Sequence, residues 1–263
     1  MVDLIKRSVK NFNFFNIILI VVIFVSFSSG LYVFWKYWDN FNLYGLSSST
    51  EAWGQFGDYI GGLLNPILSF FSIVLLCVTL NASFRLGARQ TFESILFELI
   101  RLHRENLFSL EVRYEDEKKV GRECFLEYLD EISFRYKLLT DDTRSENERL
   151  VHACEDFFNE IKNKSGLGHY YRNLYLIYKH IDESFSIKQS EKIKYAKIVR
   201  AQISSLETDI LMLNCITEKG ASFCKYIERY SLLQEIGLEN LIRVGVSENT
   251  LLSLYSKKAY HDN

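Results

Sequence analysis

The sequence lacks the motifs that most often carry enzymatic or metal chemistry. Its five cysteines, Cys77, Cys124, Cys154, Cys215 and Cys224, include no CxxC pair, so neither a zinc site nor a disulfide framework is indicated. Reduced thiols are expected instead. HExxH and HxxxH patterns, phosphate-binding glycine loops and serine elbows are also absent. We therefore predict no metal site, no cofactor and no catalytic residue.

A basic excess is missing as well. Five of the 31 Lys and Arg residues and four of the 33 Asp and Glu residues lie at or before Arg85, which leaves a net charge of −3 beyond it. A nucleic-acid-binding surface normally shows the opposite balance. Direct nucleic-acid binding is therefore not predicted.

Charge is absent from two long apolar stretches, residues 11–35 and 59–84. The second would form about 39 Å of helix at roughly 1.5 Å per residue, enough to cross a ~30 Å hydrocarbon core. The first has the basic head of a signal peptide but is too long, lacks an A-x-A site and is followed by a second span. We predict a retained signal-anchor. The expected segments are a basic N-terminal segment (1–10), a first span (11–36), a short loop (37–57), a second span (58–85) and a domain (86–263).

Charges flanking the spans predict the orientation. The loop side carries Lys36, Asp39, Glu51 and Asp58, whereas the opposite flanks carry Lys6, Arg7, Lys10, Arg85 and Arg89. The positive-inside rule then places both termini in the cytoplasm and the loop outside. In a bacterial cell this is a two-span inner-membrane protein with a periplasmic loop.

Small and polar residues mark the second span. Gly57, Gly61, Asn65 and Ser69 recur every four residues, so a helix places them in one row. Two glycines at this spacing let another helix approach closely, and Asn and Ser can hydrogen-bond across the contact. Asp58, Gly62 and Pro66, the single proline, complete the predicted packing or gating set. The alternative is an ordinary membrane helix with a tolerated proline kink. The opposite face, with Leu63, Leu64, Ile67 and Phe71, is expected to face lipid.

Beyond Arg85 the pattern is helical. Apolar residues from Phe92 to Leu110 keep the i, i+3, i+4, i+7 spacing, so the second span is expected to continue without a break. A charged connector (113–121) and helices at about 122–139, 147–163, 169–184, 190–217 and 222–236 follow, with glycines at some boundaries. No strand pattern is found. The predicted fold class is all-α, a two-helix transmembrane hairpin followed by a helical cytosolic domain.

Several polar residues of this domain are candidates for a polar network or a partner contact: His103, His169, Arg172, Asn173, His180, Asp182, Arg200 and Gln202. Arg200 and Gln202 are expected inside a helix, where burial would require partners. Arg172 and His180 also admit an alternative, since HEPN ribonucleases use an Arg and a His on RNA phosphates. Seven residues separate the two here, which fits that family's spacing poorly.

Five segments in order resemble the phage abortive infection family of AbiC-like proteins. They are FGDYIGGLLNPILSF (56–70), FELIRLH (97–103), HYYRNLYLIYKHID (169–182), RAQISSLE (200–207) and IERYSLL (227–233). The resemblance implies an anti-phage effector in the bacterial inner membrane, with two spans and a helical cytosolic domain. Similar membrane proteins are the toxic component of some retron systems, beside a reverse transcriptase and its RNA–DNA hybrid.

The resulting hypothesis is a membrane effector that a phage-triggered signal releases to permeabilise the membrane. Its expected partners are the lipid bilayer, further copies of itself through the hairpin, and a reverse transcriptase with its RNA–DNA hybrid. Two alternatives stay open: a membrane-anchored HEPN-like ribonuclease, and a membrane-anchored sensor or scaffold subunit of a defence complex.

Overall fold

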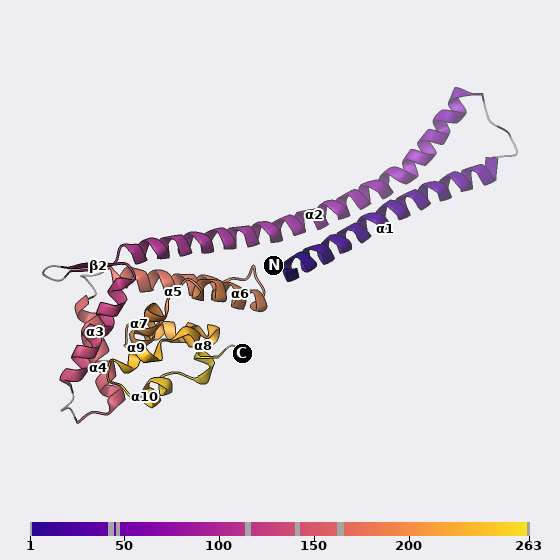
Figure 1. Cartoon of the computed structure of the whole chain (residues 1–263). Helices are drawn as coiled ribbons and strands as arrows, with labels where there is room; N and C mark the ends of the chain where they lie inside the picture. The colour runs from indigo at the N-terminus through magenta and orange to yellow at the C-terminus, as the bar shows by residue number, and fades with distance from the viewer. Residues whose placement is uncertain are drawn as a thin grey trace. The chain divides into compact units, whose positions relative to one another are not determined.

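The protein divides into two compact units, 1–87 and 88–263. The computed structural model describes residues 2–41, 45, 48–113, 117–139, 143–161 and 166–261, and within the first helix the side chains of residues 17 and 19–40. Both units are built almost entirely of helices (Figure 1). The two units are described separately below.

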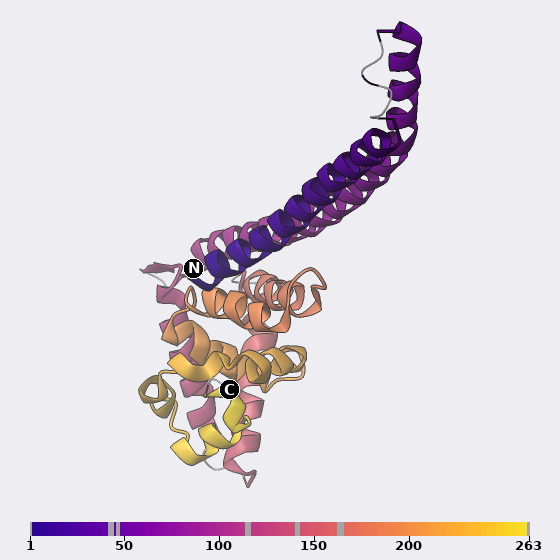
Figure 2. The ribbon, with the colours of Figure 1, turned by 90° about the vertical axis from the view of Figure 1, so that its right-hand side faces the viewer.

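The first unit contains α1 (Val2–Phe41) and most of the apolar part of α2 (Thr50–Phe108). The two helices run antiparallel and side by side in both views (Figures 1 and 2). Near their loop-side ends the ring of Tyr37 lies 4.4 Å from that of Phe56 and 6.0 Å from that of Tyr59. Both helices are long and apolar enough to cross a membrane, by length and composition.

Helix α2 is uninterrupted from Thr50 to Phe108, with Pro66 inside it, so the predicted continuation of the second apolar stretch is confirmed. A proline lacks the N–H that would complete the helical hydrogen bond, but residues around it can retain helical geometry. The same helix therefore contributes residues to both units.

The second unit begins with the last part of α2 and contains a short hairpin and a set of helices. Its strands are β1 (Glu111–Arg113) and β2 (Lys118–Val120), which pair antiparallel. Its α-helices are α3 (Glu123–Leu138), α4 (Glu146–Ile161), α5 (Leu167–Glu183), α6 (Gln189–Arg200), α7 (Ser205–Cys215), α8 (Cys224–Tyr230), α9 (Leu238–Ile242) and α10 (Glu248–Ser253). The 3₁₀ turns η2 (Ala221–Phe223), η3 (Leu232–Glu235) and η4 (Lys257–Ala259) complete it.

Helix α7 is the centre of the second unit. Eight of its eleven residues are buried: Glu207, Thr208, Asp209, Ile210, Leu211, Met212, Leu213 and Cys215. A helix buried on nearly all sides must be surrounded by others, and α3, α4, η3 and α9 all pack against it. The apolar core around α7 includes rings such as Tyr128, Tyr170 and Phe157.

Three predictions about this unit are wrong in detail. The charged connector (113–121) contains β2 and the last residue of β1, so the unit is nearly all-α and not entirely so. The helix predicted over 190–217 is broken between α6 and α7, because Ser204 has extended backbone (φ −78°, ψ 166°) and its hydroxyl accepts a hydrogen bond from the Glu207 amide. A serine that caps the following turn ends one helix and starts another. The helix predicted over 222–236 is likewise divided, into η2, α8 and η3.

Gly220 lies in the turn that follows α7. A Cβ atom at this position would lie 2.0 Å from the carbonyl oxygen of Asn214 and 2.8 Å from the Cα of Cys215. Neither atom can move without displacing the end of α7. Only glycine fits this close approach between the turn and the central helix.

Candidate functional site

The row of small residues on α2 points away from α1. Gly57, Asn65 and Ser69 are exposed and Gly61 is half-buried. A Cβ at Gly57 would meet nothing within 4 Å, and one at Gly61 would meet only the Asn65 side chain of the same helix. Asp58, Gly62 and Pro66 are exposed as well. Within the described part of the first unit the row is therefore not covered by α1.

The face opposite this row is the one that contacts α1. Leu64, Ile67 and Phe71 are half-buried, so part of each side chain packs within this unit and only the rest is available to face lipid. Ile67 and Leu63 line a hollow together with α1 residues that include Phe24 and Val33. Bulky apolar side chains bury more area against a neighbouring helix than a row of glycines does.

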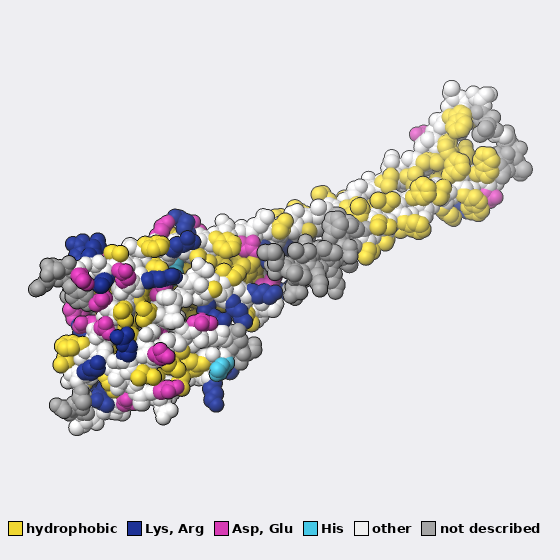
Figure 3. Space-filling model, in the orientation of Figure 1, with side chains coloured by type: hydrophobic (Ala, Val, Ile, Leu, Met, Phe, Trp, Pro, Cys, Tyr) yellow, Lys and Arg dark blue, Asp and Glu magenta, His cyan; other side chains and the backbone are white. Residues whose placement is uncertain are grey.

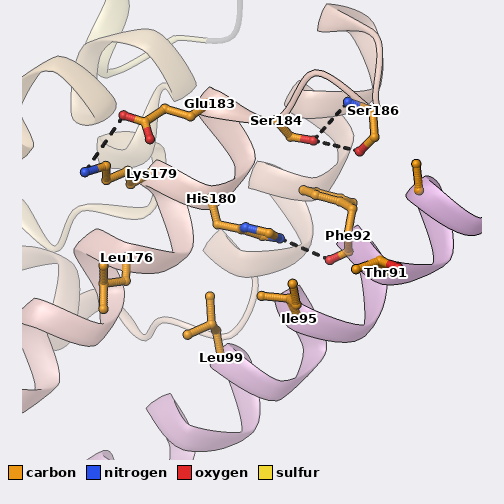
Figure 4. Close-up of a pocket in the computed structure, with 11 residues that line it drawn as sticks. Thr91, Phe92, Ile95, Leu99, Leu176, Lys179, His180, Glu183, Ser184 and Ser186 are labelled. Atoms are coloured by element: carbon orange, nitrogen blue, oxygen red, sulfur yellow. Dashed lines mark hydrogen bonds and ion pairs between the residues drawn. The ribbon is translucent and has the colours of Figure 1, made fainter.

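A groove of about 490 Å³ runs between α2 and α5 in the second unit (Figure 4). The α2 wall includes Thr91, Phe92, Ile95 and Leu99, and the α5 wall includes Leu176, Lys179, His180 and Glu183. Ile95 and Leu176 are nearly half exposed, so apolar surface is open to solvent there. We call this the α2–α5 groove.

The imidazole of His180 joins the two walls. Its Nε2 lies 3.1 Å from the carbonyl oxygen of Phe92, and its ring stacks on the Phe92 ring at 4.8 Å (Figure 4). Because a carbonyl oxygen only accepts hydrogen bonds, Nε2 is the donor in this contact. The His180 side chain therefore holds α5 against α2.

Arg172 does not join His180. Its Nη2 donates to the Nδ1 of His169 at 3.2 Å, and both residues line a different hollow at the start of α5. The pair that the ribonuclease alternative requires is thus placed in two separate hollows of the chain, with His180 in the α2–α5 groove.

Beside the groove an ion-pair network connects α2 to α6. The guanidinium of Arg89 donates to Glu93 at 3.0 Å, to Glu191 at 3.2 Å and to the hydroxyl of Tyr195 at 3.3 Å. Tyr195 in turn donates to Glu93. Hydrogen bonds from Tyr195 and Arg89 lower the pKa of Glu93 against the opposing effect of burial. One guanidinium thus bridges two carboxylates, one on α2 and one on α6, and this arrangement fastens the two helices together.

A second polar cluster is centred on Glu207 of α7, whose side chain is almost fully buried. Its carboxylate accepts hydrogen bonds from Arg122 Nε at 2.7 Å, from the Tyr170 hydroxyl at 2.7 Å and from the Ser204 hydroxyl at 2.8 Å. We call these four residues the Glu207 cluster. A buried carboxylate is tolerated only when its lone pairs are satisfied in this way.

His103 packs against this cluster. Its ring lies 4.4 Å from that of Tyr170, and neither ring nitrogen has a hydrogen-bond partner among the described residues. Burial lowers the pKa of His103 to about 4, although the charge of Glu207 acts in the opposite direction. The imidazole is therefore neutral at physiological pH. Its place on the apolar side of the cluster supports a structural role.

Three of the other predicted polar residues, Asp182, Arg200 and Gln202, form hydrogen bonds within the second unit. Burial raises the pKa of Asp182, but hydrogen bonds from Arg229 (2.6 Å) and Tyr230 (2.7 Å) outweigh it and the net shift is downward. Arg200 donates to the Ser231 carbonyl at 2.7 Å. The expectation that Gln202 is buried inside a helix is wrong, because it lies exposed in the turn after α6. Its backbone carbonyl accepts a hydrogen bond from Arg122 at 2.9 Å. The Asn173 Oδ1 is buried without a partner among the described residues.

The cysteine thiols and histidine rings form no metal-binding cluster in the part of the chain that the structure describes. Cys124, Cys154 and Cys215 are buried, Cys224 is half-buried and Cys77, on α2, is exposed, and all five are free. Among the described residues no group of three or more His, Cys, Asp and Glu side chains is placed to hold a metal ion.

Reasoning from the sequence missed Glu207, Tyr170, Arg122 and Asp209 as buried polar centres. The signal for Glu207 was available, since Ser204 and Glu207 have the S-x-x-E spacing of a capping box. The partners Tyr170 and Arg122 lie far away in sequence, so no local pattern identifies them.

The fold and these sites define a class of protein: two long apolar helices, the second of which continues into a helical unit with buried polar clusters. Residues 162–241 match the family model described as "Putative phage abortive infection protein". The resemblance to the AbiC-like family is thereby confirmed over this segment, which contains three of the five resembling motifs and all of α5, α6, α7 and α8. Searches of curated proteins and of solved structures gave no match.

Proposed function

We propose that this chain is a bacterial inner-membrane effector of abortive phage infection that permeabilises the membrane when a phage-triggered signal releases it. The family match over 162–241 supports the role in abortive infection. The apolar parts of α1 and α2 form the two spans, and the second unit is cytoplasmic with both termini.

Exposed apolar side chains support the membrane part of this proposal. On α1, Phe24 and Phe27 each expose about two-thirds of their surface (68% and 67%), and on α2 Phe70 and Leu76 do the same (63% and 65%). On the described part of the two helices apolar side chains predominate in the visible face, whereas charged side chains are frequent on the second unit (Figure 3). An apolar surface of this extent is costly in water and favourable in lipid.

The single observation that carries the mechanism is the uncovered small-residue row on α2. Because α1 occupies the opposite face, Gly57, Gly61, Asn65 and Ser69 remain available to a helix of another copy. Glycines permit close backbone approach in lipid, and Asn and Ser hydrogen-bond across it. In this proposal released hairpins associate through the row and the assembled helices make the membrane leaky.

The packing role of the small-residue row on α2 can be tested by replacing one of its glycines with a bulky residue. Gly61→Leu places a branched side chain where a second helix would approach. We expect this variant to be inserted normally but to lose phage protection and the loss of membrane potential during infection, read with a voltage-sensitive dye in single cells. Gly30→Leu is the matched control, since Gly30 lies in α1, outside the row, and a Cβ there meets nothing within 4 Å.

Two outcomes would contradict the proposal. Full protection and depolarisation with Gly61→Leu would remove the packing role of the row. Growth arrest without depolarisation, abolished by His180→Ala, would favour the ribonuclease alternative.

The proposed partners are a reverse transcriptase and its RNA–DNA hybrid. A tagged copy of the chain, purified from its native host, should recover both. Recovery of neither would favour an effector that acts without them.

A further inference from the structure

The hollow at the start of α5 combines positive charge with an apolar wall. It measures about 550 Å³ and is lined by Phe158 and Ile161 of α4, Gly166 to His169, Tyr171 and Arg172 at the start of α5, and Asn214 and Lys219 near the end of α7. We call it the α5 hollow. Among these residues there is no carboxylate, so its ionisable side chains are basic or phenolic.

Three nitrogen-bearing side chains converge there from two places in the chain. Arg172 and His169 come from the first turns of α5, and Lys219 comes from the turn after α7. Arg172 and Lys219 are exposed, and neither forms an ion pair with a carboxylate in the part of the chain that the structure describes. This contrasts with Arg89, Arg122, Arg135 and Arg229, each of which pairs with Asp or Glu.

Two of these cations are held in place by hydrogen bonds to uncharged acceptors. Arg172 donates to His169 Nδ1, which leaves the proton of the neutral ring on Nε2 as a further donor. Lys219 donates to the side-chain oxygen of Asn159. An arginine positioned by a neutral partner keeps its charge and its remaining N–H groups for a ligand.

The other lining residues indicate that the ligand also has an apolar part. The rings of Phe158 and Tyr171 lie 6.4 Å apart, edge to face, and Leu167 and Ile161 add apolar surface. The Tyr171 hydroxyl is buried and has no hydrogen-bond partner among the described residues. The hollow is also larger than an inorganic anion requires, since pockets for organic ligands begin at about 300 Å³.

We propose that the α5 hollow binds a small phosphate-bearing organic molecule, with Arg172, Lys219 and His169 on the phosphate and the Phe158–Tyr171 wall against its apolar part. The first turn of α5 adds the positive end of a helix dipole beside these cations. The hollow lies almost entirely within the family-matched segment. Binding here is a property of the cytoplasmic unit that does not depend on permeabilisation.

Isothermal titration calorimetry of the full-length chain in detergent tests this, with adenosine 5′-monophosphate as the probe. Adenosine is the uncharged control, and inorganic phosphate is added as a competitor. We expect the monophosphate to bind at least about ten-fold more tightly than adenosine, since charge-assisted hydrogen bonds are the strong ones. Phosphate should displace it.

Arg172→Gln and Lys219→Gln should each weaken monophosphate binding by about ten-fold or more, because each removes one cation from the phosphate. Arg113→Gln is the matched control, an exposed arginine outside the hollow. An unchanged melting temperature in all three variants shows that the fold is intact. Equal affinity for monophosphate and adenosine, no binding of the monophosphate, or binding that Arg172→Gln and Lys219→Gln leave unchanged would each overturn the proposal.

Discussion

The hydroxyl of Tyr170 donates a 2.7 Å hydrogen bond to the carboxylate of Glu207, and both side chains are almost completely buried. The bond joins α5 to the central helix α7 at a point where Arg122 supplies the countercharge from the other side. A donor lost from a buried carboxylate leaves part of its desolvation uncompensated.

Tyr170→Phe should therefore destabilise the second unit by about 1–3 kcal/mol. Hydrogen exchange of the α7 amides, followed by mass spectrometry on the full-length chain, measures this as faster opening. Tyr171→Phe is the matched control, because the neighbouring Tyr171 hydroxyl is buried with no partner among the described residues. Equal effects of the two substitutions would show that the Tyr170–Glu207 bond adds no stability.

Protonation of His103 should lower the stability of the second unit at acidic pH. Its pKa is about 4 in the folded chain and near 6.5 when unfolded, so the unfolded chain takes up the proton first. The stability that His103 contributes is present above about pH 6.5 and is lost as the pH falls toward 4. His103→Phe keeps the ring against Tyr170 and removes the proton site. Thermal unfolding between pH 7.5 and 4.5 should show a smaller loss in this variant than in the native chain.

Asp209 gives the opposite pH dependence. Burial raises its pKa to about 6, although hydrogen bonds from the Gly237 amide and Asn240 act against this. The folded chain binds the proton more tightly than the unfolded chain, so the stabilising contribution is complete below about pH 4 and is lost as the pH rises through 6. Asp209→Asn should be more stable than the native chain at pH 7.5, by up to about 3 kcal/mol for a two-unit shift. A native-like melting temperature for the variant at pH 7.5, with unchanged pH dependence, would contradict this assignment.

Gly220→Ala should be among the most damaging single-methyl additions in the chain. The new Cβ would overlap the Asn214 carbonyl, and relief requires movement of the end of the buried helix α7. Overpacking of this kind costs about 1–3 kcal/mol and sometimes more. The melting temperature should fall by several degrees, whereas Gly87→Ala, where a Cβ meets nothing within 4 Å, should leave it unchanged or raised.

Local patterns in the sequence were sufficient for most of the helices. The apolar spacing through Leu96 and Leu107 predicted a second apolar helix that continues beyond its uncharged part, and α2 runs to Phe108. The uncharged runs likewise predicted the two long apolar helices. These features depend on residues within a few turns of one another, which is why periodicity finds them.

The parts that could not be predicted depend on distant contacts. Residues 190–217 were read as one helix because their propensities are helical throughout, whereas the Ser204 cap and the surroundings of Glu207 divide it. The β1–β2 hairpin is too short to show alternation. The α5 hollow needs Arg172 and Lys219 from separate elements, and only the fold brings them together.

The distribution of thiols has a practical consequence. Cys77 is the one exposed cysteine of the five, and it lies in the uncharged part of α2. A nitroxide attached to it, with Cys224 replaced by serine, would report its own surroundings by electron paramagnetic resonance. Relaxation by molecular oxygen, which concentrates in hydrocarbon, against relaxation by a water-soluble nickel chelate would give the immersion depth of this helix in a native-like bilayer. A label at Cys77 that contacts the nickel chelate and not oxygen would show that this part of α2 lies in water, which would contradict the proposed second span.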